Sequence, residues 1–308
     1  MPEIRGQKAW LLAGLGWMAA GYVASVAAPD PIDPAAWGGD HVGKPMPDYI
    51  TGEECLFCHR DVGATWGGNR HQLTMRPVDD RAGMPEGAQF LMGNKRATRV
   101  QKRSKSDGKL DMHTVGGSPH WDTKIFSDRC AGCHATAVDS EARAFAALSL
   151  DCFVCHGNVS LEHTKDTSRV LLSKTNRESH HIASTCGQCH LRGGRSKSTE
   201  LPYPNHFVSG DNLFRDFQVD LSKEAVAALP AVEQHIYSNT RDVVMLGQTA
   251  TTCLSCHDVH GGRTKKHQKL TTAVICSSCH VSGTDNEELK EALLPANRLR
   301  DHSRVCDY

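Results

Sequence analysis

The sequence predicts a mostly irregular chain with short α-helices and one small β-hairpin. Three observations lead to this prediction. The pentapeptide Cys-x-x-Cys-His occurs six times in 308 residues. Aromatic residues make up only 6% of the chain and the mean hydropathy is negative, so side chains alone do not account for the whole interior. Outside the repeated motif, hydrophobic periodicity is sparse.

The first 27 residues are predicted to be a secretory signal peptide or an N-terminal membrane anchor. Arg5 and Lys8 precede an uncharged run over residues 9–28. That run is long enough to span a bilayer, yet Ser25 and Ala27 are small residues at the positions that signal cleavage requires. Both alternatives place the rest of the chain outside the cytoplasm, in the periplasm or a similar space. Membrane contact is expected only through this segment, if it is retained.

Residues 28–47 are rich in Pro, Gly, Ala and Asp, which predicts a linker. One domain is then expected over residues 48–308, with four of the repeated motifs in residues 48–200 and two in residues 240–285. The hairpin is predicted for residues 96–100 and 109–115, because the Asp-Gly pair between them favours a tight turn.

Short helices are predicted for three segments, Ser140–Leu148, Ser222–Ala228 and Glu287–Leu294. Pro230 and Pro295 follow the last two segments and would end them. The spacing between motifs has no fixed period, so the chain does not resemble a solenoid.

Each repeated motif is interpreted as a c-type haem attachment site. Two thiols add to the vinyl groups of one haem, and the adjoining histidine becomes an axial ligand of its iron. Positions i, i+3 and i+4 share one face of a helical turn, so these three side chains can reach one porphyrin. The sequence therefore predicts six covalently bound haem c groups in a stacked array, which gives the fold class of a multihaem cytochrome c.

The cysteines predicted to attach haem are Cys55, Cys58, Cys130, Cys133, Cys152, Cys155, Cys186, Cys189, Cys253, Cys256, Cys276 and Cys279. The predicted proximal ligands are His59, His134, His156, His190, His257 and His280. Zinc ribbons also use paired cysteines, and the 18 residues between Cys133 and Cys152 would fit such a site taken alone. A histidine after every pair favours haem, and twelve of the thirteen cysteines lie in the motifs, which leaves only Cys306.

The second axial ligand of each iron decides the function. An iron held by two side chains suits electron transfer, whereas an open position can bind a small molecule. Twelve histidines lie outside the motifs, so the supply of imidazoles exceeds the demand for six distal ligands. We expect His71, His163 and His260 to be distal ligands. Further candidates are His113, His120, His180 and His181, then His206, His235, His267 and His302, and the thioether of Met245, whose alternative is core packing.

Charge gives no support for a nucleic-acid partner, because Lys plus Arg equals Asp plus Glu at 35 each. Ionised haem propionates would make the assembled protein acidic by roughly six charges. That balance favours basic or dipolar redox partners.

The motifs and their flanks resemble those of exported multihaem cytochromes related to the tetrahaem cytochrome of ammonia oxidation. More distantly, they resemble octahaem hydroxylamine oxidoreductase and pentahaem nitrite reductase. The resemblance spans Gly52 to Gly261. Its residues are Cys55–Arg60 with Trp66 and His71, Arg129–Thr136, Asp151–Gly157 with His163, Cys186–His190, and Cys253–His257 with His260.

This resemblance implies haems stacked in near-parallel and near-perpendicular pairs, with His71, His163 and His260 as distal ligands. Two features of the relatives are missing. The sequence has no Cys-x-x-Cys-Lys motif, and none of its five tyrosines can be matched to the cross-linking tyrosine of hydroxylamine oxidoreductases. Both differences weigh against those two chemistries.

The expected function is electron transfer between a quinol-linked or periplasmic donor and a terminal acceptor, with redox proteins or a quinol-oxidising complex as partners. Two alternatives stay open at this point. One is an oxidoreductase with one open-site haem acting on a small nitrogen or sulfur compound. The other is a subunit of a conducting cytochrome filament.

Overall fold

The computed structural model describes residues 42, 44, 47–79, 83–93, 98–107, 109–114, 117–157, 159, 161–165, 172 and 178–261. The N-terminal segment predicted as a signal or anchor, the sixth motif with Cys276, Cys279 and His280, and the helix predicted for Glu287–Leu294 lie outside these residues. None of the helices in the described ranges is long and apolar enough to cross a membrane.

The fold mixes short helices and strands. Its helices are α1 (Gly52–Cys58), α2 (Arg60–Trp66), α3 (Ile125–Arg129), α4 (Ala131–His134), α5 (Cys152–His156), α6 (Ser179–His190), α7 (Lys223–Ala228), α8 (Ala231–Leu246) and α9 (Cys253–Cys256). Its strands are β1 (Met75–Pro77), β2 (Phe90–Met92), β3 (Arg99–Arg103), β4 (Leu110–His113), β5 (Trp121–Asp122), β6 (Ala135–Asp139), β7 (Ala144–Leu148), β8 (Arg195–Ser196) and β9 (Phe217–Gln218). Short 3-10 turns cover Gln72–Thr74, Leu161–Thr164 and Leu213–Arg215.

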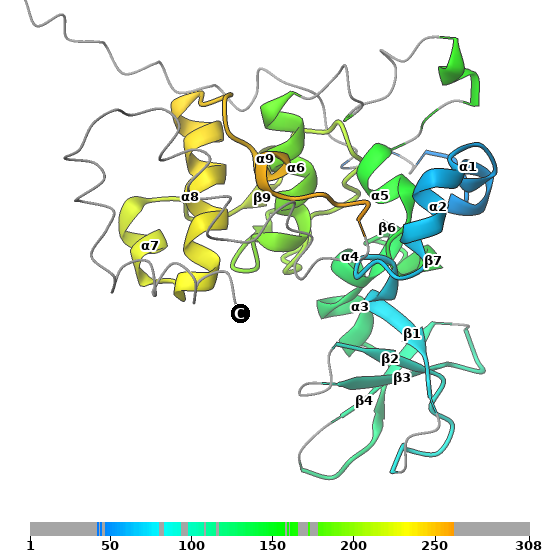
Figure 1. The fold of residues 1–308 in the computed structure, drawn as a ribbon. Helices are drawn as coiled ribbons and strands as arrows, with labels where there is room; N and C mark the ends of the chain where they lie inside the picture. The colour runs from blue at the N-terminus through cyan, green and yellow to red at the C-terminus, as the bar shows by residue number, and fades with distance from the viewer. Residues whose placement is uncertain are drawn as a thin grey trace, which may run out of the picture.

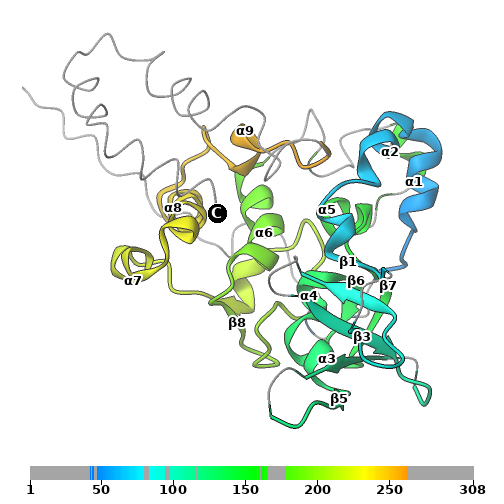
Figure 2. The same cartoon turned by 60° about the horizontal axis from the view of Figure 1, so that its bottom comes forward.

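A five-stranded antiparallel sheet projects to one side of the helices, at the bottom of Figure 1 and the lower right of Figure 2. Strands β3 and β4 pair where the sequence predicted a hairpin, although β3 begins three residues later than expected and the pair belongs to a larger sheet. One face of the sheet packs its apolar side chains against Phe126 of α3 and Ala131 of α4. The sheet is therefore anchored to the second motif.

The helix predicted for Ser140–Leu148 is wrong, because this segment contains a turn and strand β7. The Asp139 carboxylate accepts a hydrogen bond of 2.8 Å from the backbone N–H of Ala142, a local bond that favours a turn. Arg143 has a φ of 54°, which breaks a helix at that point. Phe145 and Leu148 then pack on the apolar core around the second motif, and this burial outweighs the modest helix propensity of the alanine-rich segment.

Helices α7 and α8 form the left-hand side of the molecule in Figures 1 and 2. Helix α7 begins one residue after the predicted boundary, because the Ser222 hydroxyl caps it by accepting a 3.2 Å hydrogen bond from the Ala225 N–H. Pro230 separates the two helices. A second core of buried apolar side chains, including Leu213, Phe217 and Tyr237, joins α8 to the segment that follows the fourth motif.

His206 ties three parts of the chain together. Its Nδ1 lies 3.1 Å from the carbonyl oxygen of Lys44, and its Nε2 lies 3.0 Å from a carboxylate oxygen of Asp139. The ring is 5% exposed. Since both ring nitrogens face oxygen acceptors, His206 serves to hold the chain before α1 against the hairpin of β6 and β7.

Candidate haem-binding sites

Five of the six motifs lie in the described residues, and each is built on a short helix. We number these attachment sites 1 to 5 in chain order. Their cysteines and histidines lie on or directly beside α1, α4, α5, the last turn of α6, and α9. The helical turn places the two thiols and the imidazole of one motif on one face.

Thiols of different motifs touch in three places within the described chain. A hydrogen bond joins Cys55 of site 1 to Cys152 of site 3. Another joins Cys133 of site 2 to Cys189 of site 4. A third joins Cys186 of site 4 to Cys253 of site 5. Site 4 therefore adjoins both sites 2 and 5.

Asp151 fixes the contact between sites 1 and 3. One carboxylate oxygen caps α5 by accepting a 3.0 Å hydrogen bond from the Phe153 N–H. The other accepts bonds from the Tyr49 hydroxyl and, at 3.3 Å, from the N–H of Gly52 at the start of α1. Burial, followed by the hydrogen bond to Asp151, raises the pKa of Tyr49. Tyr49 therefore stays a neutral donor to the carboxylate.

Each of three motif histidines lies near a histidine from elsewhere in the described chain. The ring centroids of His59 and His163 are 5.9 Å apart, with an interplanar angle of 14°. Those of His156 and His260 are also 5.9 Å apart, at 28°. Those of His71 and His190 are 6.4 Å apart, at 87°. The three distal ligands expected from the sequence are thus each beside the histidine of a different motif.

These separations fit a metal ion between the rings. A bond from a metal to an imidazole nitrogen is about 2 Å long, so two imidazoles on opposite sides of one ion have centroids about 6 Å apart. All three pairs lie close to that value. The side chains present therefore fit haem held by His59 with His163, His156 with His260, and His190 with His71.

Burial and neighbouring groups shift the pKa of the motif thiols in both directions. Burial raises the pKa of Cys130 to about 11. Burial, with the neighbouring Cys55 and Asp151 charges, raises that of Cys152 to about 12. Hydrogen bonds with the thiols of Cys189 and Cys186 lower the pKa of Cys133 and Cys253. No group of three or more His, Cys, Asp and Glu side chains converges as a metal site within the described residues.

Asn69 positions two of the histidines and was not identified from the sequence. Its side chain is fully buried. The amide oxygen accepts a 2.9 Å hydrogen bond from the His71 N–H, and the amide nitrogen donates a 2.7 Å bond to the Val259 carbonyl. The Thr65 hydroxyl adds a 2.8 Å bond to the carbonyl of His260. The loop after motif 5 is thereby held against the end of α2.

Replacing Asn69 with alanine is expected to lower the free energy of unfolding by about 1–3 kcal/mol, because a buried N–H and a buried carbonyl lose their partners. The low-spin electron paramagnetic resonance signals assigned to the His71 and His260 pairs should shift as well. Thermal unfolding and spectra of the oxidised holoprotein would measure both effects. Gln234→Ala is the matched control, since in the described part of the chain the Gln234 amide nitrogen bonds the Ala227 and Leu229 carbonyls and no histidine segment. Equal effects in the two variants would contradict the positioning role.

The remaining distal candidates occupy other surroundings. His113 packs edge-on against Trp121 in the sheet, with centroids 5.1 Å apart. His120 lies in the following turn, where its Nδ1 is 3.0 Å from the Ser118 carbonyl. His180 and His181 lie in the first turn of α6, with ring centroids 4.3 Å apart. Burial lowers the pKa of both. No described contact joins His113 or His120 to a motif histidine.

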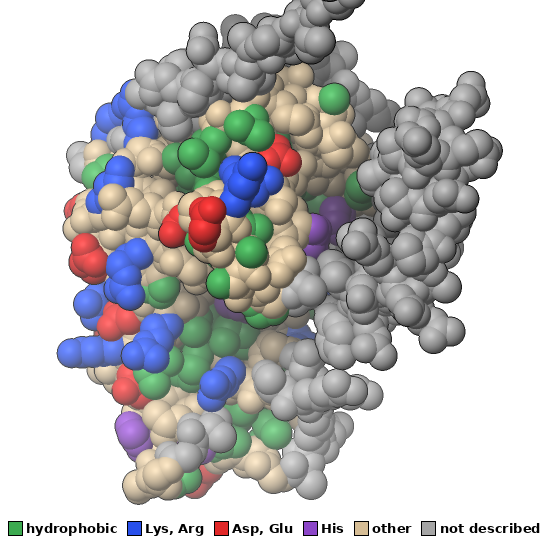
Figure 3. All heavy atoms as spheres, turned by 90° about the vertical axis from the view of Figure 1, so that its left-hand side faces the viewer, with side chains coloured by type: hydrophobic (Ala, Val, Ile, Leu, Met, Phe, Trp, Pro, Cys, Tyr) green, Lys and Arg blue, Asp and Glu red, His purple; other side chains and the backbone are tan. Residues whose placement is uncertain are grey.

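Two further candidates lie in surroundings that do not suit a haem ligand. Met245 is 45% exposed near the end of α8. Basic and acidic side chains are interspersed on the side of the molecule that Figure 3 shows. His206 has both ring nitrogens beside oxygen acceptors. His267, His302 and Cys306 lie outside the described residues.

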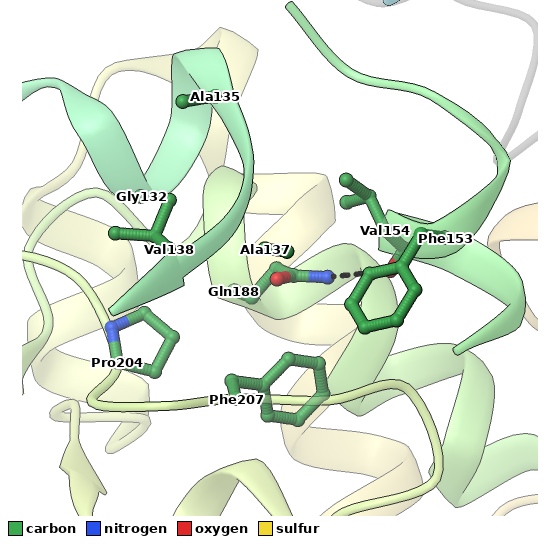
Figure 4. A pocket seen from close by; sticks show the side chains of 9 residues that line it. All are labelled: Gly132, Ala135, Ala137, Val138, Phe153, Val154, Gln188, Pro204 and Phe207. Carbon is green, nitrogen blue, oxygen red and sulfur yellow. Dashed lines mark hydrogen bonds between the residues drawn. The ribbon is translucent and has the colours of Figure 1, made fainter. Parts of the chain in front are cut away.

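Sites 2, 3 and 4 meet around a small pocket (Figure 4). Gly132, Val154 and Gln188, each from between the two cysteines of its motif, line the pocket. The Gln188 amide nitrogen donates a 3.3 Å hydrogen bond to the Val154 carbonyl, drawn as a dashed line. Pro204 and Phe207 close the pocket from the segment after α6. The three motifs are thus packed through the residues between their cysteines.

Comparison with known proteins gives one family match. The family described as "Doubled CXXCH motif" matches residues 247–284, which contain motifs five and six. No curated protein and no solved structure matches the chain. The doubled motif, together with the geometry of the attachment sites, indicates a multihaem c-type cytochrome that binds haem c covalently.

Proposed function

We propose that this protein carries electrons outside the cytoplasm between a quinol-linked or periplasmic donor and a terminal acceptor, with six covalently bound haem c groups. Each bound haem supplies one-electron chemistry at its iron. The chain's own residues would hold the six groups at fixed spacing and set the ligands of each iron.

The three histidine pairs carry this proposal. A motif histidine with a second imidazole about 6 Å away would hold an iron on both sides and leave it no position for a substrate. Such sites suit electron transfer. The pairs involve sites 1, 3 and 4, so this property is shared by sites from three separate motifs.

The arrangement of attachment sites also supports a relay. Site 1 touches site 3, and site 4 touches sites 2 and 5 through thiol contacts. The Gln188 bond to Val154 joins site 4 to site 3. The described sites therefore form a continuous series from site 1 to site 5, with site 2 branching at site 4. This arrangement would let an electron donor bind at one end of the series and an electron acceptor at the other.

A second candidate function is favoured by one observation. His134 of site 2 has no imidazole neighbour among the described residues, and its Nδ1 is buried without a hydrogen-bond partner. If the iron held by His134 kept an open position, the protein could act as an oxidoreductase on a small nitrogen or sulfur compound.

Two measurements on the mature protein test the proposal. The intact mass should contain six haem increments, and the oxidised protein should show low-spin ferric signals from sites 1, 3 and 4. Protein without covalently bound haem would contradict the proposal altogether. A dominant high-spin signal that shifts on addition of nitrite or hydroxylamine would favour the oxidoreductase instead.

A further inference from the structure

The second attachment site borders a methionine-rich core. Met75, Met92 and Met112 are 5%, 7% and 3% exposed. They belong to one apolar cluster with Ala131, inside the second motif, and Ala135, directly after it, and Cys130 packs against that cluster. Thioether sulfur binds haem iron in His/Met-ligated cytochromes. The flexible methionine side chain adapts to such a position more readily than a branched one.

Met75 is the methionine whose backbone is joined most directly to His134. The carbonyl of the preceding residue, Thr74, hydrogen-bonds the His134 ring. This contact places the residue before Met75, at the start of β1, beside the His134 ring. Ser149 makes a second link, since its hydroxyl accepts a 3.2 Å bond from the Met75 N–H and its own N–H donates a 3.0 Å bond to the His134 carbonyl.

The position of Met75 in the chain agrees with this placement. His71, four residues earlier, lies beside His190 of site 4. Sites 2 and 4 touch through Cys133 and Cys189. His71 therefore lies at a site that adjoins site 2. Because Met75 follows His71 by only four residues, it lies close to site 2. Met92 and Met112 are farther along the sheet, because β2 pairs with β1 at Met75↔Met92 and β4 is separated from β1 by two strands.

We propose that the thioether of Met75 is the second axial ligand of the iron at site 2. The inference rests on the proposed function and deepens it. A thioether ligand raises the reduction potential of a haem relative to two imidazoles. The haem at site 2 would therefore be reduced before those at sites 1, 3 and 4. It would store an electron next to site 4, where site 2 branches from the series.

The experiment compares the mature wild-type protein with three leucine variants of similar volume. Wild-type oxidised protein should show the near-infrared charge-transfer band of a thioether-ligated ferric haem in magnetic circular dichroism. Met75→Leu should abolish this band and convert about one haem per molecule to high spin. Met92→Leu and Met112→Leu, in the same core, should keep the band. Met75→His should restore a low-spin haem with the spectrum of two imidazoles.

Several outcomes would overturn the assignment. Wild-type protein without the thioether band would do so even if Met75→Leu failed to mature. A band lost in Met92→Leu or Met112→Leu but retained in Met75→Leu would assign the ligand elsewhere. The haem count separates this inference from the proposed function: six haems by intact mass with an unchanged Met75→Leu spectrum would overturn only the ligand, whereas protein without haem would overturn both.

Discussion

Replacing His71 with alanine is expected to convert one low-spin ferric haem per molecule to high spin, because the ring that faces His190 at a centroid separation of 6.4 Å is removed. The His71 N–H, not its ring, donates the hydrogen bond to the Asn69 side-chain oxygen, so the local fold should be retained. Electron paramagnetic resonance of the oxidised variant measures the change. Added imidazole should return the haem to low spin by occupying the open position.

His120→Ala is the matched control for this prediction. The sequence makes both histidines candidates, but the His120 ring bonds within its own turn, to Ser118 and Thr114. Its removal should leave every haem signal unchanged. If His120→Ala produced the high-spin haem and His71→Ala did not, the pairing of His71 with His190 would be wrong. The same comparison can be made at site 1 with His163→Ala.

Local patterns predicted the features that depend on neighbouring residues. The attachment sites lie on helical turns because the thiols and imidazole of a motif recur at i, i+3 and i+4. The Ser222 cap and Pro230 mark the two ends of α7, close to where they were expected. The segment Ser140–Leu148 failed as a helix because its conformation is decided by pairing with β6 and by burial of Phe145 and Leu148, neither of which its own sequence reveals.

Contacts between segments that lie far apart in the chain could not be predicted from the sequence. It marked His71, His163 and His260 as ligands, but it could not assign them to motifs, since each pairing depends on how distant segments fold together. Asn69 illustrates the reason, because its amide bonds a carbonyl 190 residues away. Met75 looks like an ordinary strand residue until β1 is seen beside the second motif. The stacked haem array and the six-haem count stay predictions.

Gly132→Ala is expected to destabilise the protein strongly, although the position lies between two motif cysteines where many residues are acceptable. An added Cβ would lie 2.3 Å from Cγ of Tyr203. The Tyr203 ring is 1% exposed and its hydroxyl bonds the Ser127 carbonyl, so it cannot move aside freely. Overpacking of this kind costs about 1–3 kcal/mol, and displacing the hydroxyl adds about 1 kcal/mol. Thermal unfolding of the mature protein would show the loss.

Gly67→Ala provides the control, because no atom lies within 4 Å of a Cβ at Gly67 and its φ of −56° suits any residue. Comparable unfolding temperatures for the two variants would contradict the argument. The segment from Tyr203 to Ser209 explains why motif 2 has a glycine at position 132. Tyr203 packs on Gly132 of site 2, and the Ser209 hydroxyl donates a 2.5 Å bond to the Cys155 carbonyl of site 3 and contacts Thr185 beside site 4 at 3.0 Å. Because this segment contacts sites 2, 3 and 4, a substitution that lifts it should change the spectra of the haems proposed at these three sites together.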